Sequence, residues 1–107
     1  MKRVAVKMVR IYLTEEKAHL DKLMAYLHDQ EKVRGVTVFR GISGYGKSGV
    51  IHSSSLLDMS LNLPVVVEFY DFAEKIDQIL ENIDKLPGTM IEPGHIVSWA
   101  AEANLKG

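Results

Sequence analysis

Segments with strand character and segments with helical periodicity alternate along this chain of 107 residues, and their order limits the possible folds most strongly. Residues 4–13, 36–40, 64–70 and 95–100 are rich in β-branched and apolar side chains, as β-strands are. Pro64 opens the third of these segments, a position in a strand where proline is tolerated. Four strands are therefore expected, separated by regions of different character.

Two amphipathic helices are predicted between these strands. Thr14 is expected to cap the first helix, and Asp71 with Glu74 forms a capping-box pattern at the start of the second. Within each helix, apolar residues recur three and four positions apart and so define one buried face. The apolar positions are Leu20, Leu23, Met24 and Leu27 in the first helix, and Ile76, Ile79, Leu80 and Ile83 in the second. Both faces are expected to pack on the sheet.

The resulting order, strand–helix–strand–strand–helix–strand, is a doubled βαβ unit. It predicts a ferredoxin-like α+β fold, in which a four-stranded antiparallel sheet carries both helices on one face. A chain of 107 residues has the size of one domain, so residues 1–107 are assigned to a single unit. The other face of the sheet is left bare, and bare faces with large apolar side chains are usually covered by another subunit. We therefore expect an oligomer.

Composition argues against several classes of function. The chain has 13 basic and 14 acidic residues, a formal net charge of −1 and no basic stripe, which argues against nucleic-acid binding. Cysteine is absent, which removes disulfides, thiolate catalysis and cysteine-bound zinc and fits a cytoplasmic protein. No window approaches the roughly 20 apolar residues of a membrane span, so direct membrane insertion is not expected.

Residues 41–62 form a long glycine- and serine-rich connection, and connections of this length in a small domain are typically functional or disordered. Its base, Gly41-Ile42-Ser43-Gly44-Tyr45-Gly46-Lys47-Ser48, matches the phosphate-loop pattern G-x-x-x-x-G-K-[ST]. In a nucleotide hydrolase this motif opens a helix. Here it runs into Gly49, two β-branched residues and a serine run, which disfavour a helix. The motif therefore indicates a loop that binds an anion through backbone N–H groups and a lysine.

No catalytic or metal-binding constellation is recognised in the sequence. The histidines, His19, His28, His52 and His95, show no chelating spacing, so no metal site is predicted. Three serines follow His52, but adjacency in sequence does not supply the geometry of a triad, and no G-x-S-x-G motif is present. We therefore predict no catalytic residues and no enzymatic activity.

Residues 33–49 resemble the second strand and loop base of the PII signalling proteins, which have a G-[MV]-T-V strand followed by a G-F-G turn. Residues 49–52 and 63–68 are more similar to an uncharacterised PII-like family known as a domain of unknown function. The resemblance covers nearly the whole chain and is specific in residues 35–52. It implies a ferredoxin-like homotrimer that binds an adenine nucleotide or a related anionic effector in clefts between subunits, as an effector and not as a resident cofactor.

The same resemblance implies roles for particular residues. The residues that would face the ligand are Gly44, Gly46, Lys47, Ser48 and Gly49 at the loop base, and Gly88, Gly94 and His95 in a second phosphate-facing loop. His95 stands where PII proteins have a phosphate-binding lysine, and Ala100–Ala103 replace their C-terminal arginines. The long loop is expected to change conformation with the ligand and to dock on a protein partner such as a membrane transporter.

Three functions from different classes remain open. In the leading hypothesis the chain is a small-molecule-sensing regulator, in which an anionic effector at residues 44–49 orders the rest of the 41–62 loop for a partner protein. In the second it is an oligomeric interaction module without a ligand, and the glycines only form a turn. In the third it is a small phosphate-loop-like nucleotide hydrolase, although the sequence shows no recognisable partner carboxylate.

Overall fold

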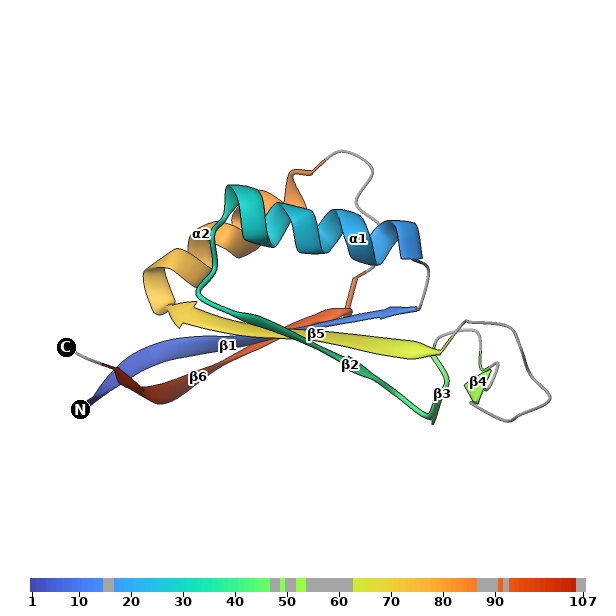
Figure 1. Cartoon of the computed structure of the whole chain (residues 1–107), viewed down its shortest axis with the longest axis horizontal. Coiled ribbons are helices and arrows are strands. Elements are labelled where there is room, and N and C mark those ends of the chain that lie inside the picture. The colour runs from blue at the N-terminus through green and yellow to red at the C-terminus, as the bar shows by residue number, and fades with distance from the viewer. Residues whose placement is uncertain are drawn as a thin grey trace.

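The computed structural model describes residues 1–14, 17–46, 49, 52–53, 63–86, 91 and 93–105. They form a four-stranded antiparallel sheet, in the order β2-β5-β1-β6, with the helices on one face (Figure 1). The strands are β1 (Lys2–Thr14), β2 (Val36–Arg40), β5 (Pro64–Phe72) and β6 (Ile96–Leu105); the helices are α1 (Lys17–Ala25), its π-helical continuation η1 (Tyr26–Gln30) and α2 (Ala73–Asp84). The predicted ferredoxin-like α+β fold is confirmed.

β1 is longer than predicted at both ends. It begins at Lys2 and ends at Thr14, which lies opposite Pro64 of β5. Thr14 belongs to the ladder with β5, and α1 is described from Lys17 onward, so the expectation that Thr14 caps the first helix stays a prediction. Glu15 and Glu16, between the two elements, lie outside the described residues.

β6 is also longer than predicted and continues past Ala100 to Leu105. Alanine has a low strand propensity, and this stretch of the chain is rich in it. The stretch nevertheless pairs with the start of β1, from Lys2 opposite Leu105 to Val6 opposite Ala101. Backbone pairing with a neighbouring strand thus sets a conformation that local composition does not favour.

The predicted capping box at the start of α2 is wrong. Asp71 still belongs to β5, where it lies opposite Lys7, and Phe72 is the residue before the helix. Phe72 makes no side-chain cap, and its N–H donates a hydrogen bond to Asp71 Oδ1 at 2.8 Å. Because the strand continues past Tyr70, Asp71 is one residue too early to cap the helix.

The core lies between the helices and the inner face of the sheet. Its fully buried members include Val9, Ile11, Val67 and Phe69 from the strands and Leu27, Ile76, Ile79 and Ile83 from the helices. Leu20, Met24 and Leu80 are partly buried against the same cluster, which confirms the predicted apolar faces of both helices. Burying one such aliphatic side chain contributes about 1.5–3 kcal/mol. Among the described residues, no helix has the length and apolar character needed to cross a membrane.

The outer face of the sheet carries no helix in the described part of the chain (Figure 1). Successive residues of a strand point to opposite faces, so the neighbours of the core residues point outward here. We call this surface the open sheet face; it includes Met8, Arg10 and Tyr12 of β1, Val66, Glu68 and Tyr70 of β5, Thr37 and Phe39 of β2, and Val97 and Trp99 of β6. Phe39 is 49% exposed and Trp99 is 40% exposed. This is the bare apolar surface that the fold predicts.

The two ends of the sheet carry different structures. At one end, which we call the loop end, β1 and β2 finish and β5 and β6 begin. A two-stranded ribbon of β3 (Ser43–Gly44) and β4 (His52–Ser53) extends from this end (Figure 1). At the other end, the far end, β5 passes into α2 and the N- and C-terminal parts of the chain lie side by side.

Candidate functional site

The predicted loop base begins directly after β2, at the loop end. The N–H of Gly41 donates a hydrogen bond to the carbonyl oxygen of Pro64 at 2.7 Å. A Cβ atom at Gly41 would lie 2.7 Å from Pro64 Cγ, and a Cβ atom at Gly44 would lie 3.1 Å from it. Neither glycine has a positive φ angle. These two glycines are required because the loop base crosses closely over the start of β5.

The ribbon that follows was not expected from the sequence. Gly44 of β3 lies opposite His52 of β4, and Ser43 lies opposite Ser53. The sequence offers little signal for such short strands, because each has only two residues and one of them is glycine.

A tight turn lies between the two strands of the ribbon. The N–H of Gly49 donates a hydrogen bond to the carbonyl oxygen of Gly46 at 2.9 Å, and Gly49 has a φ of +76°, which favours glycine. Three predicted site residues, Gly44, Gly46 and Gly49, thus lie in one short hairpin. Lys47 and Ser48, predicted to face the ligand, lie outside the described residues. The described residues after the motif form a turn and a strand, in agreement with the prediction that the motif does not open a helix.

The second predicted loop also lies at the loop end. Gly94 has a φ of +84°, so this turn requires a residue that tolerates the left-handed region. The carbonyl oxygen of His95 accepts a hydrogen bond from the N–H of Tyr12 at 2.8 Å, which ties the turn to the end of β1. Gly88, predicted for the same loop, lies outside the described residues.

The structure brings the two predicted loops to one end of the sheet but places them at opposite edges. Ile11 of β1 lies opposite both Ile96 of β6 and Val67 of β5, and Val67 lies opposite Val38 of β2. The start of β6 is therefore level with the middle of β2, three strand spacings away, or about 14 Å. Within one chain, the loop base and the turn at residues 93–95 do not form a single pocket.

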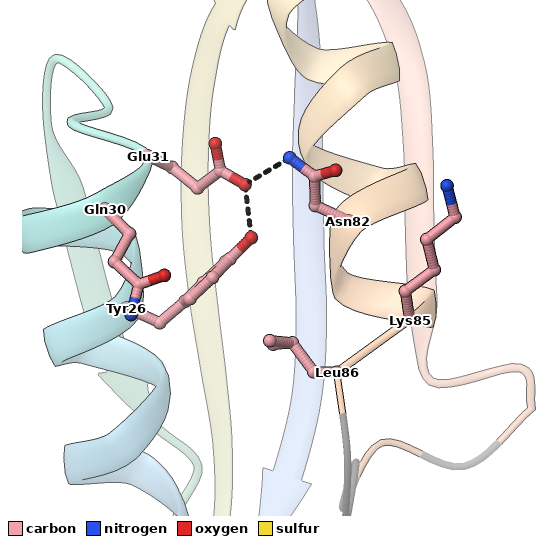
Figure 2. Close-up of a pocket in the computed structure, with 6 residues that line it drawn as sticks. All are labelled: Tyr26, Gln30, Glu31, Asn82, Lys85 and Leu86. Carbon is pink, nitrogen blue, oxygen red and sulfur yellow. Dashed lines mark hydrogen bonds between the residues drawn. The ribbon is translucent and has the colours of Figure 1, made fainter.

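A pocket between the helices was missed by sequence reasoning. It has a volume of about 330 Å³ and is lined by Tyr26, Gln30, Glu31, Asn82, Lys85 and Leu86 (Figure 2). Glu31 Oε2 accepts hydrogen bonds from the hydroxyl of Tyr26 and, at 2.9 Å, from Asn82 Nδ2. Partial burial, followed by the hydrogen bond to Glu31, raises the pKa of Tyr26 to about 12. The bonds span from η1 to α2, and a sequence pattern on either helix alone does not reveal them.

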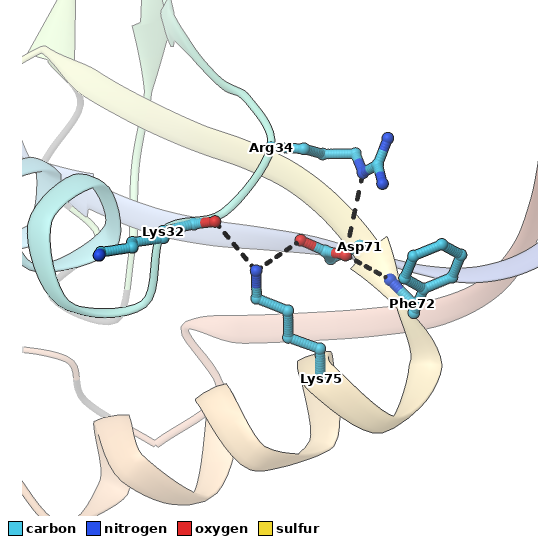
Figure 3. Close-up of polar contacts among 5 residues, drawn as sticks. All are labelled: Lys32, Arg34, Asp71, Phe72 and Lys75. Atoms are coloured by element: carbon cyan, nitrogen blue, oxygen red, sulfur yellow. Dashed lines mark hydrogen bonds and ion pairs between the residues drawn. The ribbon is translucent and has the colours of Figure 1, made fainter. Parts of the chain in front are cut away.

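A second polar cluster, at the far end, surrounds Asp71 (Figure 3). Asp71 is 3% exposed, and its carboxylate lies 3.2 Å from Lys75 Nζ and 3.9 Å from Arg34 Nε. Lys75 Nζ also donates a hydrogen bond to the carbonyl oxygen of Lys32 at 2.9 Å. The guanidinium of Arg34 lies over the Phe72 ring, 5.3 Å from its centroid. These contacts fasten the segment between η1 and β2 to the junction of β5 and α2, which is a structural role.

In the described part of the chain, no group of three or more histidine, cysteine, aspartate or glutamate side chains could hold a metal ion. His28 Nδ1 lies 2.7 Å from Asp29 Oδ1 on the surface of η1.

Solved structures define the class of protein to which this fold belongs. CPII, a nitrogen regulatory PII-like protein from Thiomonas intermedia K12 solved with ADP, AMP and bicarbonate, matches with a TM-score of 0.66 and 19% identity over 97% of this chain and 100% of that one. A putative PII-like signaling protein from Thermus thermophilus matches with a TM-score of 0.61 and 15% identity over 96% of this chain and 91% of that one. The fold is that of the PII-like proteins.

The family follows from sequence. The model of the DUF190 family, described as "Uncharacterized ACR, COG1993", matches residues 6–103. A UPF0166 protein of Aquifex aeolicus (strain VF5) is 41% identical over 87 residues, which cover 78% of this chain and 83% of the relative. A UPF0166 protein of Methanocaldococcus jannaschii is 35% identical over 85 residues, 75% of this chain and 77% of the relative. The chain belongs to the DUF190 family, as the resemblance to an uncharacterised PII-like family indicates.

Proposed function

We propose that this chain is a PII-like regulatory protein that senses an adenine nucleotide or another anionic effector, and that it is not an enzyme. The main support for the proposal is the position of two glycine-containing turns at the loop end. A glycine hairpin with backbone N–H groups, at residues 44–49, and a glycine turn, at residues 93–95, stand at opposite edges of the same end of the sheet. The PII-like neighbour CPII was solved with ADP, AMP and bicarbonate, which supports an anionic ligand.

The effector site is proposed to be completed between subunits of a homotrimer. One chain places the loop base beside β2 and the 93–95 turn beside β6, and these are the two edge strands of the sheet. In a closed ring, the β2 edge of one subunit approaches the β6 edge of the next. The loop base of one copy then faces Gly94 and His95 of its neighbour, and Lys47, Ser48 and Gly88 are proposed as further ligand contacts.

The signal is proposed to travel through the 41–62 loop. A ligand shifts the balance between loop conformations only through contacts that differ between them, and the hairpin at residues 44–49 supplies such contacts. The ordered loop then docks on a protein partner such as a membrane transporter, in the cytoplasm. No residue in this proposal has a catalytic role.

Thermal unfolding in the presence of nucleotides tests the proposal. A ligand at about one hundred times its Kd stabilises the folded state by about 2.7 kcal/mol, which corresponds to a rise in Tm of about 10 °C for a domain of this size. We expect this rise with ADP, AMP or ATP and a smaller rise for Lys47→Ala. Lys22→Ala, an exposed lysine on α1, is the matched control and keeps the full rise. A wild-type Tm that no nucleotide or common anion changes contradicts the proposal.

A second candidate, an oligomeric interaction module without a ligand, is favoured by one observation. The close approach to Pro64 accounts for Gly41 and Gly44 without any bound molecule. In this alternative the nucleotides leave both the Tm and the proteolysis of the 41–62 loop unchanged, while the oligomer persists. Release of phosphate from ATP above the buffer background, in the presence of magnesium, is the result that supports the third hypothesis, a hydrolase.

A further inference from the structure

Glu31 places a carboxylate on the wall of the pocket between η1 and α2 (Figure 2). Its Oε2 accepts hydrogen bonds from the hydroxyl of Tyr26 and, at 2.9 Å, from Asn82 Nδ2. The amide is neutral, and the hydroxyl keeps its proton at neutral pH because partial burial and then the bond to Glu31 raise the pKa of Tyr26 to about 12. In the described part of the chain, no lysine, arginine or histidine side chain forms an ion pair with Glu31. The described residues therefore leave one negative charge of this pocket without a cation.

The π-helical form of η1 brings Tyr26 and Glu31 together. Residues five positions apart in an α-helix point about 140° apart around the axis, so their side chains do not meet. In η1 the N–H of Glu31 donates a hydrogen bond to the carbonyl oxygen of Tyr26 at 3.1 Å, which closes a turn of five residues. Lys32, the next residue, has a φ of +50°, a strained angle for a residue with a side chain. Single π-helical turns and strained backbone occur often at functional sites, which makes this wall of the pocket a candidate site.

A ligand with an ammonium group fits the pocket. A carboxylate has about four acceptor positions, and the bonds from Tyr26 and Asn82 leave room for further donors. An ammonium group supplies three N–H donors and the missing positive charge. The Tyr26 ring and the Leu86 side chain, which line the same pocket, provide apolar surface for a short hydrocarbon chain. The volume of about 330 Å³ is within the range of small-molecule sites.

A metal ion fits the pocket less well than an organic cation. Glu31 is the one carboxylate among the lining residues, and hard metal ions are bound by six or more oxygen ligands, usually with several carboxylates. No group of three or more acidic, histidine or cysteine side chains suited to a metal ion occurs within the described residues. The pocket therefore favours a cation that also has apolar surface.

We propose that this pocket binds a small molecule through a primary ammonium group held by Glu31, with the hydrocarbon part of the molecule against Tyr26 and Leu86. No described residue of the proposed effector site lines the pocket, so the inference does not rest on the proposed function. Two sources share this chemistry, a simple amine and a free amino acid. Lys85, also in the lining, is 71% exposed and lies 3.6 Å from Glu81, a weak pair that leaves it able to turn toward the carboxylate of an amino acid.

Three probes with one hydrocarbon skeleton separate the two charges of the ligand. L-leucine carries an ammonium and a carboxylate group, isopentylamine carries only the ammonium group, and 4-methylpentanoate carries only the carboxylate. Each is titrated into the ¹⁵N-labelled protein at neutral pH and followed by NMR. We expect the two ammonium compounds to shift the amide signals of residues 30–31 and 82–86, and 4-methylpentanoate to leave them unchanged. Tighter binding of L-leucine than of isopentylamine identifies an amino acid as the source, and equal or weaker binding identifies a simple amine.

Glu31→Gln tests the charge while keeping the local structure, because the new amide oxygen still accepts hydrogen bonds from Tyr26 and Asn82. We expect the Kd of isopentylamine to rise at least about tenfold in this variant, with a Tm close to that of wild type. Glu74→Gln, an exposed glutamate in the first turn of α2, is the matched control and keeps the wild-type Kd. Lys85→Met weakens the binding of L-leucine alone if the source is an amino acid.

Three results overturn the inference. The first is that neither ammonium compound shifts the amide signals of the pocket at millimolar concentration, and the second is that 4-methylpentanoate shifts them as isopentylamine does. The third is a folded Glu31→Gln variant that binds isopentylamine with the wild-type Kd. Each of these results leaves Glu31 with the structural role of joining η1 to α2. The probe series on the wild-type protein decides the question even if the variant does not fold.

Discussion

The two ends of the sheet are held together by different kinds of contact. At the far end, side chains fasten the structure, since Asp71, 3% exposed, lies between Lys75 and Arg34. At the loop end, the described contacts that position the two turns join backbone atoms, from Gly41 to Pro64 and from Tyr12 to His95. A buried carboxylate and its two cations thus hold the far end together, whereas backbone hydrogen bonds position the glycine-containing turns of the loop end.

The largest change in the free energy of unfolding is expected for a substitution at the far end. Asp71→Ala removes the partner of two cations and of the Phe72 N–H, and it is expected to lower the free energy of unfolding by about 3 kcal/mol. Asp77→Ala, whose side chain is 59% exposed, is the control and is expected to change it by less than about 0.5 kcal/mol. Urea unfolding measures both. Equal effects of the two substitutions contradict the structural role of the buried Asp71.

A smaller loss of stability is expected for a substitution at the loop base. Gly41→Ala places a Cβ atom 2.7 Å from Pro64 Cγ and is expected to cost about 2 kcal/mol. Gly46→Ala meets nothing within 4 Å and is expected to be nearly neutral for stability. Thermal unfolding of the two variants, with and without ADP, separates the structural role of the first glycine from the ligand contact proposed for the second. A neutral Gly41→Ala contradicts the close crossing over β5.

The smallest loss of stability is expected on removing a hydrogen bond between η1 and α2. Tyr26→Phe removes the hydroxyl that donates to Glu31 and is expected to cost about 0.5–1 kcal/mol near neutral pH. Because the pKa of Tyr26 is raised to about 12 in the folded state, from about 10 in the unfolded chain, the unfolded state loses its proton first. Stability is therefore lost as pH rises from about 10 through 12.

Urea unfolding across this alkaline range measures the slope that Tyr26 contributes. Tyr26→Phe is expected to have a shallower loss of stability with pH than wild type. Identical slopes for Tyr26→Phe and wild type contradict the assignment of the raised pKa to Tyr26.

Sequence patterns predicted the fold well because its elements depend on periodicity. The apolar positions of α1 and α2 and the strand at residues 36–40 lie where their spacing places them. Element ends were predicted less well, because they depend on partners distant in the chain. Asp71 has the composition of a helix cap, yet pairing between β1 and β5 keeps it in a strand.

The candidate site was predicted only in part. Glycines at the loop base and at Gly94 are visible in the sequence because turns and close backbone contacts require them. The distance between the two loops depends on strand order, which the local pattern does not contain. The Tyr26–Glu31–Asn82 bonds and the Arg10–Trp99 contact join residues from different elements, so no single motif indicates them.

We propose that one effector contacts the loop base of one subunit and the 93–95 turn of its neighbour. Amide hydrogen exchange with and without ADP tests it most directly, because backbone N–H groups are the proposed ligand contacts. ADP is expected to slow exchange in peptides covering residues 44–49 and in peptides covering residues 93–95. Protection confined to the pocket at Tyr26 and Asn82, or no protection in either loop, would contradict it.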